Sequence, residues 1–155
     1  MPRVVVPFTN LHPVTKQVLD NYGLNVEYVH LEGDDGYRQL MKRLWNERKD
    51  VVIVEHDIVP WPGAIEELVA CPCTWGTYSY ELLGGIGVTH GFGCAKLTRS
   101  LMDCVPDVWD APLKWDILDQ KLFFTARTLG IEPHLHRPPV VHLSGKHQKR
   151  GQDAH

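Results

Sequence analysis

The sequence predicts an α/β fold with a mostly parallel central sheet flanked by helices. Two observations lead to this prediction. Three short apolar runs have the composition of buried strands: residues 4–8, 24–31 and 51–54. Between them lie two segments whose apolar residues recur at helical spacing, residues 13–22 and 37–45. A strand–helix–strand–helix–strand order of this kind is typical of parallel sheets with right-handed crossovers.

Capping and turn-forming residues set the expected bounds of these elements. Pro13 suits the first turn of the first helix, and Gly23 suits its end. The third apolar run breaks off at Glu55 without a spacer. In sheets of this class, ligands bind at the carboxyl ends of the strands. Three segments follow those ends and should converge on one crevice: residues 7–10, 30–32 and 55–57.

The second half of the chain is expected to add shorter strands and further helices. The expected helices are residues 64–70, 98–104 and a long helix over 110–129 that Gly130 closes. The expected strands are residues 74–80, 90–96 and one or two within 132–141. Trp115 and Leu129 are assigned to the buried stripe of the long helix. Gly91 and Gly93 should let another part of the chain approach the backbone closely.

Length and composition suit one compact domain, expected over residues 1–145, with no linker or repeat. The net charge of −3 and the lack of a basic block in the body of the chain argue against a general nucleic-acid-binding surface. A basic run at 146–150 falls in the C-terminal tail, residues 146–155, which we expect to be flexible and solvated. No stretch approaches the ~20 apolar residues of a membrane span. We therefore expect no membrane span and a cytoplasmic protein.

Cysteines and histidines give a weaker indication of a metal site. We expect the four cysteines to be reduced and mostly packed, because Cys71-Pro72-Cys73 lacks the two-residue spacing of common zinc and redox motifs. His134 and His136 would face the same side of a strand. They could form a zinc pair, but no third ligand is evident nearby in the sequence, so we favour a surface or supporting role.

The segment Glu55-His56-Asp57 gives a stronger indication. Two carboxylates at the end of a buried strand are costly to leave unpaired, and a shared cation relieves their repulsion. Oxygen ligands of this kind suit Mg²⁺ or Mn²⁺, which would in turn bind phosphate oxygens. The alternative is a solvent-facing acidic loop in which Asp57 caps the turn at Pro60.

The run Val51-Val52-Ile53-Val54-Glu55-His56-Asp57 resembles the strand and DxD-type motif of GT-A glycosyltransferases, with glutamate at the first acidic position. The resemblance implies a single Rossmann-like GT-A domain in which Glu55 and Asp57 bind Mn²⁺ or Mg²⁺. In that family the cation bridges the diphosphate of a nucleotide sugar, here a UDP- or GDP-sugar. The residues that the resemblance places around the nucleotide are Pro7, Phe8, Thr9, Asn10, Glu32 and His56.

Two later segments extend the resemblance over roughly residues 3–145. The run from Trp115 to Leu122 is similar to the family's W-x-x-E-D-x-x-L segment, although Leu118 replaces the glutamate. This makes Asp119 the candidate general base and Asp116 the reserve; alternatively, both are simply favoured in the first turns of a helix by its dipole. Val140-Val141-His142 resembles the C-terminal strand whose histidine completes the metal site, so His142 is the expected third ligand.

Four residues are expected on the sugar and acceptor side: Gly84, Gly85, His90 and Trp115. Glycines at 84–87 could let the backbone approach a sugar, or could form a loop that binds nothing. His90 could equally be a surface residue, and Trp115 a packing residue.

The sequence therefore predicts a metal-dependent glycosyltransferase that moves a sugar from a nucleotide sugar to a hydroxyl acceptor, with inversion and an aspartate base. Three alternatives stay open. A nucleotidyltransferase would usually have a glycine-rich basic loop after the first strand, which residues 7–14 lack. A non-catalytic nucleotide-sugar-binding module fits the missing glutamate before Asp119. A zinc hydrolase would fit the many histidines, but no H-E-x-x-H signature occurs.

Overall fold

The computed structural model of the protein describes residues 3–22, 25–82 and 85–143, and it confirms the predicted α/β architecture. Six strands form the central sheet, in the order β2-β1-β3-β8-β5-β9. Their bounds are β1 Arg3–Phe8, β2 Val26–His30, β3 Val51–Val54, β5 Trp75–Tyr78, β8 Cys94–Leu97 and β9 His134–His136. Strand β8 is antiparallel to both of its neighbours and the other ladders are parallel, so the sheet is mostly parallel.

Two further small sheets occur in the described part of the chain. Strand β4 (Ile58–Val59) pairs antiparallel with β10 (Val141–His142), and β6 (Tyr80–Glu81) pairs antiparallel with β7 (Gly87–Val88). The first of these sheets sets His142 directly opposite Ile58. It therefore brings the end of the described chain beside the loop that follows β3.

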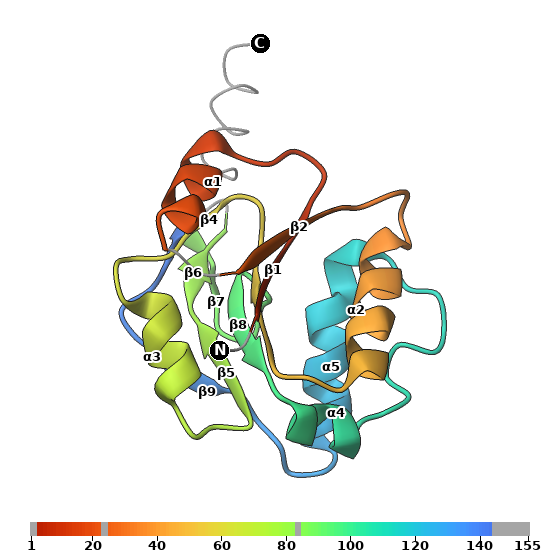
Figure 1. Ribbon diagram of the computed structural model, residues 1–155. Coiled ribbons are helices and arrows are strands. Elements are labelled where there is room, and N and C mark those ends of the chain that lie inside the picture. Colours follow the sequence, from red (N-terminus) through yellow and green to blue (C-terminus); the bar gives the residue numbers. More distant parts are fainter. Residues whose placement is uncertain (1–2, 23–24, 83–84, 144–155) are drawn as a thin grey trace.

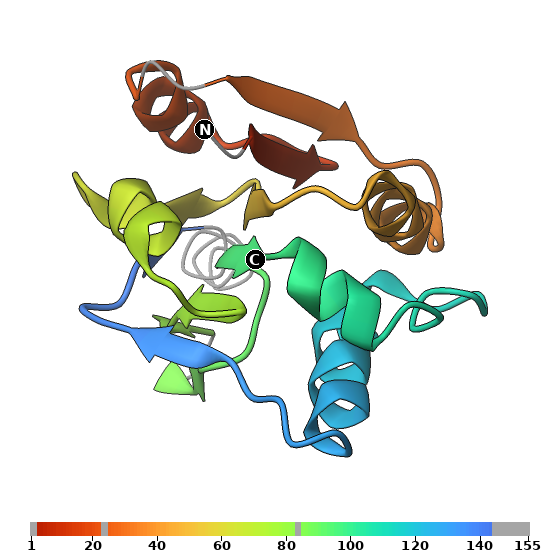
Figure 2. The ribbon, with the colours of Figure 1, turned by 60° about the horizontal axis from the view of Figure 1, so that its bottom comes forward.

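Helices cover both faces of the central sheet (Figures 1 and 2). They are α1 Pro13–Asp20, α2 Gly36–Glu47, α3 Ala64–Ala70, α4 Arg99–Cys104 and α5 Leu118–Arg127, with a 3-10 turn, η2, at Trp115–Ile117. Alternation along β1 shows the two faces. Val4 and Val6 share a buried cluster with Leu19 of α1, and that cluster includes α3. Val5 belongs to the opposite cluster, with Leu40 of α2 and residues of α4 and α5.

Side chains cap two helices, α1 and α4, at the starts that the sequence predicts. His12 precedes α1 and its Nδ1 accepts a hydrogen bond from the Val14 amide at 3.2 Å. Thr98 precedes α4 and its Oγ1 accepts from the Leu101 amide at 3.3 Å. The expected helix end at Gly23, the predicted acceptor residue Gly84 and the expected tail at 146–155 lie outside the described residues. No helix within residues 3–143, as far as they are described, has the length and apolar character to cross a membrane.

The long helix predicted over 110–129 is wrong over residues 110–114, because helical structure starts only at η2. Trp115 and Leu129, assigned to its buried stripe, are 62% and 57% exposed. The segment before η2 is held by α2 instead: Arg38 donates to the Trp109 carbonyl at 2.9 Å, and the Leu113 amide donates to Asp35 at 3.1 Å. These tertiary hydrogen bonds outweigh the helical spacing of the apolar residues.

The close approach predicted at Gly91 and Gly93 is confirmed. The ring of Tyr80, which is 6% exposed, packs against both glycines. A Cβ at Gly93 would lie 2.5 Å from the Tyr80 Cε1, and a Cβ at Gly91 would lie 2.2 Å from the Tyr80 hydroxyl oxygen. The missing side chains therefore make the space that Tyr80 fills. The same ring lies 5.6 Å, centroid to centroid, from that of His142.

Replacing Gly93 by alanine is expected to destabilise the protein by about 1–3 kcal/mol, because the new methyl group overlaps a buried ring. Urea unfolding monitored by tryptophan fluorescence measures the change. Gly87→Ala is the matched control, since a Cβ there meets nothing within 4 Å. Equal stabilities for the two variants would contradict this account of Tyr80.

Candidate active site

The loops after β1, β2 and β3 lie at one edge of the sheet, because these strands are parallel neighbours. Hydrogen bonds join the loops to one another. The Thr9 amide donates to His56 Nδ1 at 3.1 Å, and the His12 amide donates to the His56 carbonyl at 2.9 Å. The Leu31 amide donates to the Phe8 carbonyl at 2.8 Å. The three segments that the sequence places at the carboxyl ends of the strands are therefore held together.

Asp57 and His142 form a direct side-chain contact at this edge. The Asp57 Oδ2 lies 2.9 Å from the His142 Nε2, and both side chains are largely buried. The Leu143 amide donates to the Asp57 carbonyl at 2.8 Å and continues the β4–β10 pairing. His142 Nδ1 lies 2.9 Å from the Glu81 carbonyl oxygen. Because a carbonyl only accepts, Nδ1 carries a hydrogen, and Nε2 is the nitrogen that faces the site.

The Asp57–His142 contact shifts both groups toward their charged forms. The hydrogen bond to Asp57 and the negative charge of Asp57 raise the pKa of His142. Burial alone would raise the pKa of Asp57, but the hydrogen bond from His142 and the nearby imidazoles outweigh it, so the pKa of this carboxyl is lowered. His56, 3.9 Å from Asp57, is less readily charged, because burial lowers its pKa. Without another cation, His142 thus serves as the counter-charge of Asp57.

Glu55 lies at the same edge, and its carboxylate accepts a hydrogen bond from the buried Tyr37 hydroxyl at 2.9 Å. Burial raises the pKa of Glu55 to about 7, and the negative charges of Asp57 and Asp119 add to the shift, whereas the Tyr37 hydrogen bond opposes it. The charged form of Glu55 is therefore repelled by two neighbouring carboxylates. A proton or a cation is needed to relieve that repulsion.

Asp119 belongs to the first turn of α5, and its charge adds to the raised pKa of Glu55, so the two carboxyl groups lie near each other. Burial raises the pKa of Asp119, and the charge of His90 opposes that shift. The His90 ring stacks on Phe123 of α5, with the centroids 4.3 Å apart. Asp116, the reserve candidate for the general base, is exposed and lies in η2, the turn before α5. We call Glu55, Asp57 and His142 the acidic site. Asp119, with His90 near it, lies beside Glu55 of this site.

The other predicted site residues lie at varying distance from this centre. Pro7 is buried within β1, whereas Phe8 is half-buried and Thr9 and Asn10 are exposed at the strand end. The Phe8 ring meets that of His30 edge-on at 5.3 Å. Glu32 is exposed and lies 2.7 Å from His30 Nδ1. Of the residues predicted to lie on the acceptor side, Trp115 is exposed at the start of η2, and Gly85 is exposed with a φ of +77°.

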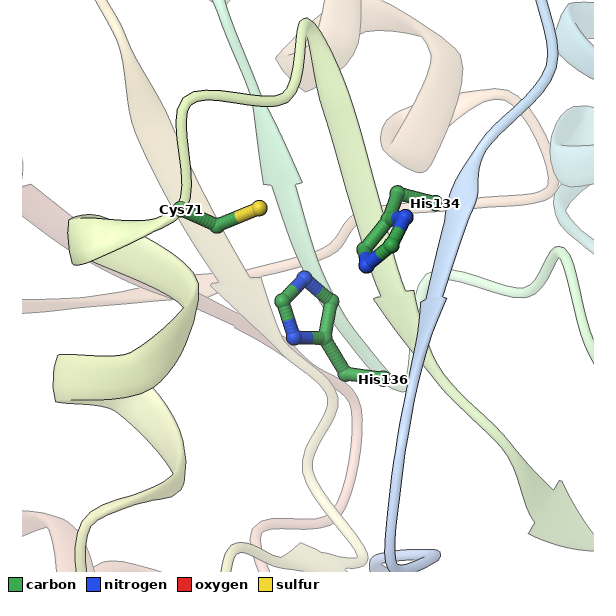
Figure 3. Close-up of side chains that lie close together, drawn as sticks. All are labelled: Cys71, His134 and His136. Atoms are coloured by element: carbon green, nitrogen blue, oxygen red, sulfur yellow. The ribbon is translucent and has the colours of Figure 1, made fainter.

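A second cluster supplies a candidate third ligand for His134 and His136, which was not evident nearby in the sequence. Within residues 3–22, 25–82 and 85–143, one trio of histidine, cysteine or acidic side chains has its ligand atoms all within 4.8 Å of one another, namely Cys71, His134 and His136 (Figure 3). Sequence reasoning missed it because Cys71 is far from the histidines along the chain. The paired patterns C-x-C and H-x-H were the available signal.

Comparison with known proteins shows the fold. No family model matches the sequence, and no curated protein matches it. Among solved structures, a glycosyltransferase involved in the glycosylation of the major capsid of PBCV-1 superposes with a TM-score of 0.60 at 12% identity, covering 97% of this chain and 98% of that one. The chain shares its fold with a glycosyltransferase. Protein A197 from STIV also superposes, with a TM-score of 0.53 at 9% identity over 66% of this chain and 68% of that one.

The Asp57–His142 pair predicts a pH-dependent stability in protein treated with EDTA. The raised pKa of His142 gives stability that is complete below the ordinary histidine value of 6.5 and is lost as the pH rises through the folded value. The lowered pKa of Asp57 gives stability that is present above 3.8 and is lost as the pH falls through its folded value. His142→Gln should therefore cost most between pH 3.8 and 6.5, about 1–3 kcal/mol, and less outside that window.

Urea unfolding of wild type and His142→Gln from pH 3 to 9 measures the effect. His30→Gln is the control, because its partner Glu32 is exposed and such surface pairs contribute about 0–1 kcal/mol. A His142→Gln penalty that stays constant over the whole range would show that the ion pair does not form.

Proposed function

We propose that this chain is a metal-dependent glycosyltransferase that transfers a sugar from a nucleotide-diphosphate sugar to a hydroxyl acceptor. The observation that carries the proposal is the contact of Asp57 and His142 at the carboxyl ends of the parallel strands. The Asp57 Oδ2 and the His142 Nε2 are 2.9 Å apart. The charges of Asp57 and Asp119 both act on the pKa of nearby Glu55. The fold shared with a glycosyltransferase over nearly the whole chain supports this reading of the site.

We assign a divalent cation to Asp57, His142 and Glu55, and the Glu55 carboxylate, which bonds Tyr37, would have to turn toward the other two. Asp57, Glu55 and His142 offer two carboxylates and one imidazole, a donor set that suits Mn²⁺ or Mg²⁺. The carbonyl of Glu81 fixes the ring of His142 so that Nε2 faces Asp57, and such outer contacts orient metal-binding histidines. Burial raises the pKa of Glu55 and the charges of Asp57 and Asp119 add to the shift, so a bound cation would stabilise its charged form. When bound, the ion would act as a Lewis acid on the leaving diphosphate.

The nucleotide is assigned to the ends of β1 and β2. Thr9 and Asn10 are exposed there and offer hydroxyl and amide groups, and Phe8 and His30 present an aromatic pair. Glu32 follows β2 and offers a carboxylate, an acceptor for ribose hydroxyls. His56, which accepts from the Thr9 amide, couples this side of the site to Asp57. We infer a UDP- or GDP-sugar as the donor.

Asp119 is assigned as the general base that takes the proton of the acceptor hydroxyl. Burial raises its pKa and thus makes it a stronger proton acceptor than a solvated carboxylate. An attack from the side opposite the leaving diphosphate would invert the anomeric carbon. His90, which opposes the shift of Asp119, and the exposed Trp115 flank the acceptor side. Stacking of a sugar on an exposed indole would suit Trp115.

The proposal predicts Mn²⁺-dependent release of nucleoside diphosphate from UDP- or GDP-sugars in the presence of hydroxyl acceptors. Asp119→Asn should lower the transfer rate about 100- to 10,000-fold, while thermal stabilisation by donor and Mn²⁺ is retained. Asp116→Asn is the matched control, because that side chain is exposed and belongs to η2. Coupled detection of the released diphosphate measures both variants.

Each alternative has its own outcome in this experiment. An undiminished rate for Asp119→Asn contradicts its role as base, and a lowered rate for Asp116→Asn would assign that role to Asp116. Stabilisation only by a nucleoside triphosphate would favour nucleotidyl transfer. Binding of the donor without turnover for any acceptor would favour a binding module.

A further inference from the structure

The cysteine and histidine cluster lies at the lateral edge of the central sheet, beside its outermost strand, β9. We propose that Cys71, Cys73, His134 and His136 form a zinc site that fastens β9 to the end of α3. This site shares no residue with the proposed glycosyltransferase site and does not depend on it. Its ligands come from the segment that follows α3 and from β9.

The geometry of the first three ligands is close to that of a zinc site. The ligand atoms of Cys71, His134 and His136 lie within 4.8 Å of one another, and the side chains point toward a common centre (Figure 3). Ligand atoms in tetrahedral zinc sites lie about 3.3–3.8 Å apart, from bond lengths of about 2.0–2.3 Å. Zinc coordination would thus require the ligand atoms to move about 1 Å closer together, which side-chain rotations supply.

The sheet explains why these residues meet. The parallel ladder sets His134 opposite Gly76 and His136 opposite Tyr78, and the H-x-H spacing directs both imidazoles to one face. Gly76 has no side chain to block that face. A Cβ there would lie 3.0 Å from Cys73 Sγ and 3.2 Å from His136 Nε2. The thiol and the imidazole therefore meet over the glycine.

Cys73 supplies the fourth ligand. Its Sγ lies 4.0 Å from His136 Nε2, and its side chain also interacts with that of Cys71. All four cysteine thiols of the chain are free. Two thiolates and two imidazoles form the donor set of closed, structural zinc sites. The soft sulfur ligands select zinc over the Mg²⁺ or Mn²⁺ proposed for the acidic site.

Contacts around the cluster already orient the ligands. Glu67 Oε1 lies 3.3 Å from His136 Nδ1, so the Nε2 of this buried ring faces the thiols. A carboxylate on the second nitrogen is a common partner of zinc-binding histidines. Lys96 is 5% exposed and its ammonium donates to the Cys71 carbonyl, which holds that segment and places a positive charge near the thiolates. The carboxylate orients the imidazole, and the ammonium is placed to stabilise thiolate ligands.

Zinc would give the short edge strand β9 a second attachment besides its pairing with β5. The chain continues from His136 to His142, the histidine that meets Asp57. The zinc site would therefore also steady the segment that delivers His142 to the acidic site.

Cobalt substitution tests the assignment in the full chain. After removal of metals with EDTA, Co²⁺ should bind with the near-ultraviolet charge-transfer band of a thiolate ligand and the intense visible bands of a tetrahedral site, and zinc should abolish both. Cys71→Ser and Cys73→Ser should each halve the charge-transfer band, whereas Cys104→Ser, at an exposed cysteine of α4, should leave it unchanged. Asp57→Asn should also leave it unchanged, which separates this site from the acidic one.

Glu67 is assigned as a positioning residue. Glu67→Gln should weaken zinc affinity about 10- to 100-fold without changing the energies of the cobalt bands. A Glu67→Gln variant that binds zinc as tightly as wild type would contradict that role.

Alkylation of the wild-type cysteines tests the proposal without relying on a variant that must fold. Zinc should suppress alkylation of Cys71 and Cys73 by N-ethylmaleimide, read by peptide mass spectrometry, while exposed Cys104 reacts alike with and without zinc. Equal alkylation of Cys71 in both states, or a Co²⁺ spectrum without a thiolate band, would overturn the proposal. A charge-transfer band that survives intact in Cys73→Ser would remove Cys73 from the ligand set.

Discussion

The pairing of β4 with β10 is the contact on which the candidate active site depends. Asp57 follows β3, whereas His142 lies near the end of the described chain, and the central sheet alone would not bring them together. The two-residue ladder sets His142 opposite Ile58, and the Leu143 amide then bonds the Asp57 carbonyl. A carboxylate and an imidazole thereby meet at the edge where three parallel strands end. They neutralise each other as an ion pair, and they are placed to become ligands of a shared cation.

The sequence predicted the parallel half of the fold and located most helices and strands of the second half, but it did not predict the segment before η2. Buried β-branched runs and helical spacing predict β1 to β3 with their helices, because both faces of a parallel sheet are covered and its strands read as continuous apolar runs. Gly91 and Gly93 likewise predicted a close approach, which Tyr80 makes. The helix predicted from residue 110 failed because Asp35 and Arg38 hold that segment through contacts with no local signal.

For the site, the sequence indicated which residues to consider but not how they pair. The acidic segment after β3 was visible as a motif, and the structure shows that Asp57 turns to His142 and Glu55 to Tyr37. The Cys71–His134–His136 cluster could not be predicted from spacing, since the parallel β5–β9 ladder creates it. One stretch of chain, residues 134–142, carries histidines of both clusters. Anything that loosens β9 should therefore also disturb the acidic site.

The central claim is that the carboxyl edge of the sheet binds a cation together with a diphosphate. Anomalous diffraction from crystals soaked in Mn²⁺ and a nucleoside diphosphate tests it most directly, because the metal is located without reference to activity. The account predicts a manganese peak between Asp57 and His142, with Glu55 in its coordination sphere and phosphate oxygens on its open side. A nucleotide-soaked crystal in which Asp57 still bonds His142 directly, and in which no manganese lies at this edge, would contradict it.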